Sequence, residues 1–289
     1  MVAFRIPKWL HQHNLSFPSF DEIPNSVFEV LQKRYTKIHA SEPVVSVVVI
    51  AYNEEQNLLK SISSLSLQKT EIPYEVIVVN NNSKDHTQQI IEKTGVRGVL
   101  EMRQGHGFAR QGGLDMAKGK YHISGDADTI YPPTHVQRFY ELLSQDGVSG
   151  AFGTYSFMPP QGKSRFSFAL YEIFRDRAVK ARALKRPELA VGGACFAFLT
   201  KAGQEIGWRT DVKRGEDGSM LLALKKYGRV VFDQGEQIRA WTSARTLIAD
   251  GNFLQMIFKR IKREFKRLGE YFTSNKSGYD DKKQNLKGH

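Results

Sequence analysis

Two carboxylates, Asp126 and Asp128, stand two positions apart, just after a short extended stretch at residues 121–124 and shortly before Pro132 and Pro133. At the end of a strand, side chains two positions apart turn toward the same point. Hard divalent cations such as Mg²⁺ and Mn²⁺ prefer oxygen ligands and often bridge one or two carboxylates to the phosphates of a substrate. The pair therefore predicts a metal-diphosphate site. A solvated turn is the alternative, because Asp and Gly are ordinary turn residues.

The segments that lead to these carboxylates alternate between strands and helices. Extended, mostly apolar runs predict strands at residues 44–52, 75–79, 98–103 and 121–124. Near-continuous apolar runs are typical of strands that are buried on both faces of a parallel sheet, and apolar residues recur at helical spacing between them. Four such alternations predict a doubly wound α/β sheet.

Polar residues follow the predicted strands, at the edge where a doubly wound sheet binds its ligands. The strand ends carry Glu54, Asn80, Asn81, Asp126 and Asp128. Because the carboxyl ends of neighbouring parallel strands meet at one edge, we expect these side chains to lie around one crevice. This shared position favours the metal-diphosphate interpretation over a solvated turn.

The rest of the chain completes this domain and adds flanking segments. Further elements are expected at residues 25–39, 133–143, 166–184, 191–199, 213–224, 230–232 and 237–241. The apolar spacing at 25–39 predicts a packing helix. We therefore predict an N-terminal brace at residues 1–43, a main domain at 44–245, a basic amphipathic helix at 246–273 and a disordered tail at 274–289.

The composition limits the class of protein. With 40% hydrophobic and 11% aromatic residues, the chain of 289 residues can form a folded core. The single cysteine, Cys195, excludes an internal disulfide and a cysteine-based zinc cluster. The sequence shows neither the apolar region of a signal peptide nor a spanning run of about eighteen apolar residues. We expect a cytoplasmic protein, or one held peripherally at the inner face of a membrane.

The net charge of +12 is concentrated in two segments. Residues 161–186 hold eight basic and two acidic residues, and residues 259–289 hold ten basic and four acidic residues. Nucleic acid, an anionic membrane surface and an acidic substrate are all compatible with this charge. At residues 253–272 an apolar stripe is surrounded by basic side chains. This helix would lie on a membrane or dock on the sheet, and both interpretations stay open.

Four motifs, in this order, resemble those of the inverting family 2 glycosyltransferases, which have the GT-A fold. They are AYNEE at 51–55, VNNNSKDHT at 79–87, GHGFARQGGLDMAKGKYHISGDADT at 105–129 and RGEDGSML at 214–221. The resemblance covers about residues 44–235. It implies a Rossmann-like, mostly parallel sheet flanked by helices, to which this chain adds its basic C-terminal helix. It also implies a hexosyltransferase that uses a nucleotide-sugar donor.

The resemblance also assigns roles to single residues. The donor-binding set that it implies is Ala51, Tyr52, Glu54, Asn80, Asn81, Arg110, Asp126, Ala127 and Asp128. Glu54 and one of the two asparagines lie at the nucleoside, and Asp126 faces the ribose or the sugar. Asp128 is the main ligand of Mn²⁺ or Mg²⁺, with Asp126 beside it. The family often has an aspartate where this chain has asparagine. Since an amide both donates and accepts hydrogen bonds, the choice of base stays open.

In this resemblance Asp217 is the general base. A carboxylate can take the proton from an acceptor hydroxyl as it attacks, while a metal ion on Asp128 offsets the charge left on the diphosphate. In-line attack predicts inversion at the anomeric carbon. We place the acceptor pocket around residues 192–195 and 160–186. We expect the acceptor to be a sugar, a lipid-linked sugar or a precursor of a cell-surface polysaccharide.

Several assignments have alternatives. Asp217 could instead be a helix N-terminal charge that interacts favourably with the helix dipole, and Arg110 is either a phosphate contact or a surface arginine. A sugar nucleotidyltransferase would carry a glycine-rich basic loop where this chain has AYNEEQNL at 51–58. A nucleic-acid-binding protein would leave the strand-end carboxylates unexplained, so no nucleic-acid partner is expected.

Other polar and aromatic residues are expected to be structural. They are His106, His122, His135, Trp208, Trp241 and Cys195. The histidines share no ligand spacing and are interpreted as scattered core or surface residues. The tryptophans are expected to pack in the core rather than against a sugar, and the cysteine is expected to fill space. Glu216 is interpreted either as a capping or positioning residue or as a catalytic one.

Overall fold

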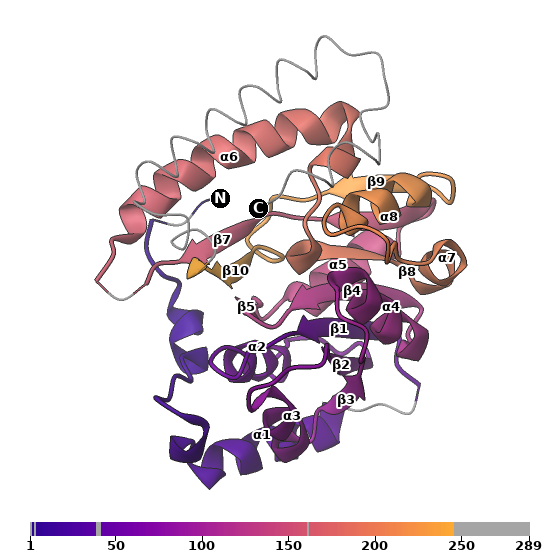
Figure 1. The fold of residues 1–289 in the computed structure, drawn as a ribbon. Helices are drawn as coiled ribbons and strands as arrows, with labels where there is room; N and C mark the ends of the chain where they lie inside the picture. The colour runs from indigo at the N-terminus through magenta and orange to yellow at the C-terminus, as the bar shows by residue number, and fades with distance from the viewer. Residues whose placement is uncertain (1, 3, 39–41, 161, 246–289) are drawn as a thin grey trace.

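The computed structural model describes residues 2, 4–38, 42–160 and 162–245 (Figure 1). Within these residues, the main layer is a seven-stranded sheet in the order β3-β2-β1-β4-β8-β6-β9. Its strands are β1 (Val45–Ala51), β2 (Tyr74–Asn80), β3 (Arg97–Leu100), β4 (Tyr121–Asp126), β6 (Val148–Phe152), β8 (Phe196–Leu199) and β9 (Arg229–Phe232). The α/β architecture with a mostly parallel sheet, expected from the alternating sequence, is confirmed.

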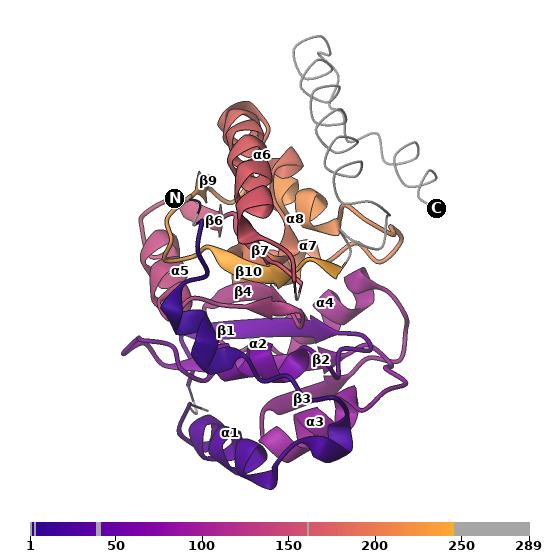
Figure 2. The ribbon, with the colours of Figure 1, turned by 90° about the vertical axis from the view of Figure 1, so that its left-hand side faces the viewer.

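The first four strands bring their carboxyl ends to one edge. β1 pairs in parallel with β2 and with β4, and β2 pairs in parallel with β3. In this register Ala51 stands opposite Asn80, and Ile50 stands opposite Asp126. The polar residues after β1, β2 and β4 therefore surround one crevice. β8 runs antiparallel to both β4 and β6. Figure 2 shows β3, β2, β1 and β4 following one another across the molecule.

Helices cover both faces of the sheet because successive residues of a buried strand point to opposite faces. On one face, Val47 and Val49 pack in a core with α1 (Asn25–Ile38), α2 (Leu58–Leu65), α3 (Thr87–Thr94) and α5 (His135–Leu143). On the other face, Val48 packs with α4 (His106–Met116). Beside β8 that face is closed by α7 (Thr200–Ile206) and α8 (Glu216–Leu224). The helices that carry site residues are thus fixed by buried apolar contacts.

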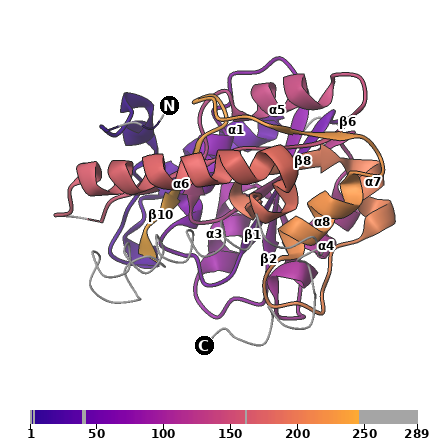
Figure 3. The ribbon, with the colours of Figure 1, turned by 90° about the horizontal axis from the view of Figure 1, so that it is seen from above.

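A second, three-stranded sheet lies beside the carboxyl ends of β1 and β4. It consists of β5 (Thr129–Ile130), β10 (Ala240–Ser243) and β7 (Tyr155–Met158). The long helix α6 (Arg165–Lys185) packs against β7 and crosses the outside of the molecule (Figure 3). Short 3₁₀ turns complete the chain: η1 (Lys8–His13), η2 (Phe20–Glu22), η3 (Pro187–Leu189) and η4 (Gly193–Cys195).

The structure departs from the sequence-based expectations mainly in the C-terminal half. The sequence pattern does not predict β6, β7 or α7, because these elements are short and two of them contain glycine. The strand expected at 237–241 is β10, shifted to 240–243, and the third strand ends at Leu100 rather than at 103. β4 continues to Asp126, so the first carboxylate of the pair belongs to the strand and not to the loop.

Two expected elements lie outside the described residues: the basic helix at 246–273, with its apolar stripe at 253–272, and the tail at 274–289. Residue 161, in the basic segment 160–186, also lies outside the description. Among the residues that the structure describes, none of the helices combines the length and the apolarity needed to cross a bilayer.

Candidate functional site

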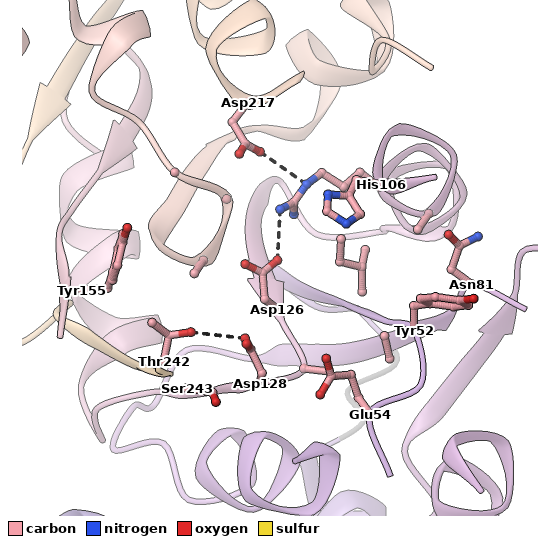
Figure 4. Close-up of a pocket in the computed structure, with 18 of the residues that line it drawn as sticks. Tyr52, Glu54, Asn81, His106, Asp126, Asp128, Tyr155, Asp217, Thr242 and Ser243 are labelled. Atoms are coloured by element: carbon pink, nitrogen blue, oxygen red, sulfur yellow. Dashed lines mark hydrogen bonds and ion pairs between the residues drawn. The ribbon is translucent and has the colours of Figure 1, made fainter. Parts of the chain in front are cut away.

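A pocket of about 490 Å³ opens between the two sheets, at the carboxyl ends of β1 and β4 (Figure 4). The expected site residues that line it are Ala51, Tyr52, Glu54, Asn81, Arg110, Asp126, Ala127, Asp128 and Asp217. Asn80 is not among the lining residues. Its Nδ2 donates to Gln88 Oε1 at 2.8 Å, and its Oδ1 accepts from the Ser83 N–H at 3.0 Å. Asn80 therefore holds the loop after β2 rather than facing the pocket.

Asn81 supports the wall of the pocket next to α4. Its Nδ2 donates to the backbone oxygens of Glu101 and Arg103 at 3.1 and 2.7 Å, and its Oδ1 accepts from the Gly105 N–H at 2.9 Å. These bonds tie the end of β2 to the turn that opens α4. Tyr52, at the end of β1, exposes about half of its surface at the same end of the pocket.

Asp126 and Asp128 lie where β4 ends, beside β10. Thr242 Oγ1 donates to Asp128 Oδ1 at 3.2 Å, and the Ser243 N–H donates to the Asp128 backbone oxygen at 3.0 Å. Burial, and then the nearby charges of Asp126 and Glu54, raise the pKa of Asp128 to about 7. Three carboxylates therefore crowd one part of the pocket, which favours a bound cation.

These carboxylates fit a divalent cation that is shared with a substrate. In the part of the chain that the structure describes, these three carboxylates influence one another's charge, but no three His, Cys, Asp or Glu side chains are grouped closely enough to hold a metal ion by themselves. Mg²⁺ and Mn²⁺ commonly take one or two carboxylates and complete their coordination with phosphate oxygens and water. Asp128 and Asp126 can supply these one or two carboxylate ligands, whereas Glu54 is paired with Arg245.

Arg110 is a buried ion-pair partner, so the surface-arginine interpretation is wrong. From α4, its Nη2 donates to Asp126 Oδ1 at 3.0 Å, and its Nε lies 3.3 Å from Asp217 Oδ1. Its guanidinium carbon lies 5.4 Å from the centroid of the Trp208 ring. A Cβ at Gly193 would come within 1.8 Å of Arg110 Nη2, so glycine lets the backbone close over the guanidinium. Arg110 thereby joins the carboxylates of β4 and α8.

Asp217 is the second residue of α8, and its side chain is directed into the same pocket (Figure 4). The side chain is only 18% exposed. Burial raises the pKa of Asp217 to about 6, although the charge of Arg110 opposes this shift. Such a carboxylate is ionised at neutral pH and is a stronger base than an exposed aspartate. Its position agrees with both interpretations, since it is also at a helix N-terminus.

His106 lines the pocket with a side chain that is 66% exposed, so it is a surface histidine, one of the two positions expected for it. Its Nδ1 lies 3.6 Å from Oε1 of the buried Glu216, the first residue of α8. The facing Glu216 raises the pKa of His106 above its usual value. This pair connects the first turns of α4 and α8, a contact that fits the positioning interpretation of Glu216, although Glu216 also lines the pocket. The signal in the sequence was the place of His106 between Gly105 and Gly107, at the start of α4.

The other residues that were expected to be structural are confirmed as parts of the interior. His122, His135, Trp208, Trp241 and Cys195 are all buried. Neither tryptophan is placed to stack on a ligand, since neither belongs to the lining of the pocket.

Sequence reasoning missed one side of the pocket. Tyr155 and Phe157 of β7 line it, together with Thr242, Ser243 and Arg245 at the end of β10. No motif marks these residues, because their strands are short. In the expected acceptor region, residues 192–194 line the pocket, whereas α6 packs against β7.

Comparison with known families identifies a matching family model. The model described as Glycosyl transferase family 2 matches residues 46–207, more than half of the chain. A curated relative, an uncharacterized glycosyltransferase of Haemophilus influenzae, is 33% identical over 119 residues, covering 39% of this chain and 36% of the relative. The chain spans 34% to 49% of the length of the relatives from Haemophilus influenzae, Haloferax volcanii and Nostoc.

Solved structures share the fold. TarS of S. aureus in complex with UDP has a TM-score of 0.54 at 18% identity, covering 80% of this chain and 72% of that chain. Glucosyl-3-phosphoglycerate synthase of Mycobacterium tuberculosis, in complex with Mn²⁺, UDP-glucose and phosphoglyceric acid, has a TM-score of 0.52 at 19% identity. That match covers 81% of this chain and 84% of that chain. Similarity at this level of identity shows a common fold.

Proposed function

The chain belongs to glycosyl transferase family 2, and on this premise we propose that it transfers a sugar from a nucleotide-diphosphate donor to a hydroxyl acceptor. The observation that carries the proposal is that Asp128 and Asp217 line one pocket. Such a transfer requires a group at the leaving diphosphate and a base at the incoming hydroxyl, both within reach of one carbon atom. Family membership favours this reaction over nucleotidyl transfer.

The arrangement supports a metal-dependent reaction with inversion. Asp128 and Asp126 would hold Mn²⁺ or Mg²⁺, which when bound supplies Lewis-acid stabilisation of the diphosphate. Asp217 takes the proton of the acceptor hydroxyl. Arg110 keeps Asp126 and Asp217 at a fixed separation through its two ion pairs. Attack from the side of Asp217, opposite the diphosphate, inverts the anomeric carbon.

The donor and the acceptor would occupy opposite ends of the pocket. The donor-binding residues of this proposal are Ala51, Tyr52, Glu54, Asn81, Arg110, Asp126, Ala127 and Asp128. The acceptor, a sugar that is free, lipid-linked or part of a cell-surface polysaccharide precursor, would enter beside residues 192–194. We keep residues 44–245 as the catalytic domain and residues 1–43 as its brace. In support of the brace, Tyr35 of α1 donates a hydrogen bond to the Ile62 backbone oxygen at 2.7 Å.

A donor screen tests this function. Nucleotide-sugars with different bases and sugars are added to the protein with and without Mn²⁺, and the melting temperature is measured. A donor at about a hundred times its dissociation constant should add about 2.7 kcal/mol to the free energy of unfolding. We expect one class of donor to stabilise the protein, and more strongly with Mn²⁺. If no nucleotide-sugar stabilises it in either condition, the proposed function is wrong.

The raised pKa of Asp217 predicts the pH dependence of transfer. A general base works only when it is ionised, so kcat/KM for the acceptor should rise with pH, bend near pH 6 and then level off. Below that pH the rate should fall about tenfold per pH unit, because one proton blocks the base. Donor and metal ion are kept saturating in this measurement, so that their own binding does not shape the profile. A flat profile between pH 5 and 7 would contradict the role of Asp217.

We also propose that the protein binds peripherally to an anionic membrane through the outer face of α6. On this helix Phe166, Leu170 and Leu184 are 57%, 50% and 80% exposed. The exposed charged residues of α6 are Arg177, Lys180 and Lys185. Its two acidic residues, Glu172 and Asp176, are buried in ion pairs with arginines. An exposed helix face with large apolar side chains, on which every charged side chain is positive, is typical of interfacial helices.

Replacing both Leu170 and Leu184 by serine is expected to weaken binding to phosphatidylglycerol vesicles about tenfold or more, because the apolar contact with lipid is lost. Co-sedimentation with vesicles measures this. The wild type should bind neutral phosphatidylcholine vesicles weakly and should release anionic ones as salt rises. Leu100→Ser, at a residue of β3 that is 56% exposed, is the matched control and should bind normally. Equal binding by the double variant and the wild type would refute the proposal.

A further inference from the structure

One end of the pocket combines an aromatic ring with two glycines. Tyr155 of β7 and Asp217 of α8 line the pocket (Figure 4). Gly192 and Gly193 also line it, and a Cβ at Gly193 would come within 2.9 Å of Asp217 Oδ1. A Cβ at Gly192 would lie 3.8 Å from Tyr155 Cε1, so a side chain there would occupy the space beside the ring. Glycine at this position leaves the space beside the ring open.

The Tyr155 ring is held from behind by a buried ion network. The guanidinium carbon of Arg175 lies 4.3 Å from the ring centroid, and Arg175 Nη2 donates to the Tyr155 backbone oxygen. Arg175 Nε donates to Asp176 Oδ1 at 3.0 Å, and Arg239 donates to Asp176 Oδ2. All three charged residues are buried. Because Arg175 does not line the pocket, it covers the face of the ring that is turned away from the pocket.

This network fixes the orientation of the ring. Buried charges are costly unless they are paired and hydrogen-bonded. Movement of β7 or α6 would break the ion pairs and hydrogen bonds of Arg175, Asp176 and Arg239, so these elements are held in place. Phe157 supports the ring further, with its plane at 87° to that of Tyr155 and its centroid 5.3 Å away. The part of Tyr155 that lines the pocket is therefore a preformed flat aromatic surface.

The charges around this end are already compensated. Among the described residues that line the pocket, the basic side chains are Arg110, Arg245 and His106. Each faces a carboxylate: Arg110 faces Asp126 and Asp217, Arg245 faces Glu54, and His106 faces Glu216. None of them is left over to pair with a phosphate or carboxylate of an acceptor. Asp217 and Glu216 instead offer oxygens that accept hydrogen bonds from hydroxyls.

We propose that this end of the pocket is a subsite for a neutral pyranose acceptor, whose C–H face stacks on Tyr155 while one hydroxyl points at Asp217. The proposal rests on the transferase function proposed above. In the transfer, the hydroxyl oxygen bonds to the anomeric carbon of the donor as the bond from that carbon to the diphosphate oxygen breaks. The hydroxyl proton goes to the Asp217 carboxylate, and the electron pair goes to the leaving diphosphate. An acceptor that carries a phosphate or carboxylate at this subsite is disfavoured.

The probes are methyl glycosides of neutral hexoses, with methyl glucuronides as matched anionic probes. Their binding to the protein, saturated with nucleoside diphosphate and Mn²⁺, is measured by saturation-transfer NMR. A neutral glycoside should bind at least about tenfold more tightly than the glucuronide of the same configuration. Tyr155→Ala should lower the affinity for the neutral glycoside about tenfold, because stacking on the ring is lost. Tyr155→Phe keeps the ring, so its affinity for the neutral glycoside should stay within about twofold of that of the wild type.

Melting temperatures with and without nucleoside diphosphate and Mn²⁺ accompany each variant, so a misfolded protein is recognised. If no nucleotide binds to the wild type, the proposed function has failed and the subsite fails with it. If nucleotide binds but no neutral glycoside does, only the subsite is wrong. The subsite is also wrong if the glucuronide binds more tightly, or if Tyr155→Ala binds the neutral glycoside as well as the wild type does.

Discussion

Asp217→Asn is expected to lower the rate of sugar transfer by a factor on the order of 10³ while leaving donor affinity within about twofold of the wild type. The amide has the size of the carboxylate but cannot take up the proton of the acceptor hydroxyl. Arg110 keeps its hydrogen bond to Asp126, so the metal-binding end of the pocket should stay in place. Initial rates of nucleoside diphosphate release in the presence of acceptor, and calorimetric titration with donor, measure the two quantities.

Asp211→Asn is the matched control for this substitution. Asp211 lies on the loop before α8, its side chain is 65% exposed, and it pairs with Arg209 rather than with a pocket residue. This variant should transfer sugar at the rate of the wild type. If Asp217→Asn retains more than about a tenth of the activity, Asp217 is not the base, and the carboxylate serves the helix terminus and the ion pair with Arg110. If donor affinity falls together with the rate, the substitution has disturbed the donor site.

The parallel half of the fold could be predicted because its strands carry their own signal. β1 is VSVVVIA and β2 is YEVIVVN, and each is bounded by the polar residues that line or support the crevice. In a parallel sheet the end of a strand is also the edge that binds ligand. A local pattern therefore located Glu54, Asp126 and Asp128 as well as the strands that position them.

The opposite wall of the pocket depends on contacts that no local pattern shows. Tyr155 reaches the pocket because β7 pairs with β10, with Tyr155 opposite Ala240, and strands this short take their stability from such pairing rather than from intrinsic propensity. Arg110 was ambiguous for the same reason. On α4 it resembles any helical arginine, and its two partners come from β4 and α8. His106 likewise gains its partner Glu216 only when α4 and α8 meet.

Asp128→Asn is expected to weaken the binding of nucleoside diphosphate about a hundredfold in the presence of Mn²⁺ and to leave the weaker metal-free binding unchanged. Asp128 is the main proposed ligand, and an amide is a poor substitute for a carboxylate toward a hard cation. A loss of this size corresponds to about 2.7 kcal/mol, within the several kcal/mol that a metal ion contributes at a developing charge. Calorimetric titration with nucleoside diphosphate, once in the presence of Mn²⁺ and once in the presence of EDTA, measures both affinities. Asp146→Asn, on the exposed surface after α5, is the control and should match the wild type.

The same variant should not melt at a lower temperature than the wild type in EDTA. Asparagine keeps the carbonyl oxygen that accepts the hydrogen bond of Thr242, and it removes one of the carboxylates that crowd Asp126 and Glu54. Without a cation, that charge destabilises the folded protein, so its loss should leave the melting temperature unchanged or raise it. A lower melting temperature would mean that Asp128 holds the end of β4 in place. Unchanged Mn²⁺-dependent binding would assign the cation to other residues. If Asp128 is a metal ligand whose charge destabilises the metal-free protein, Asp128→Asn must weaken Mn²⁺-dependent nucleotide binding without lowering the melting temperature in EDTA.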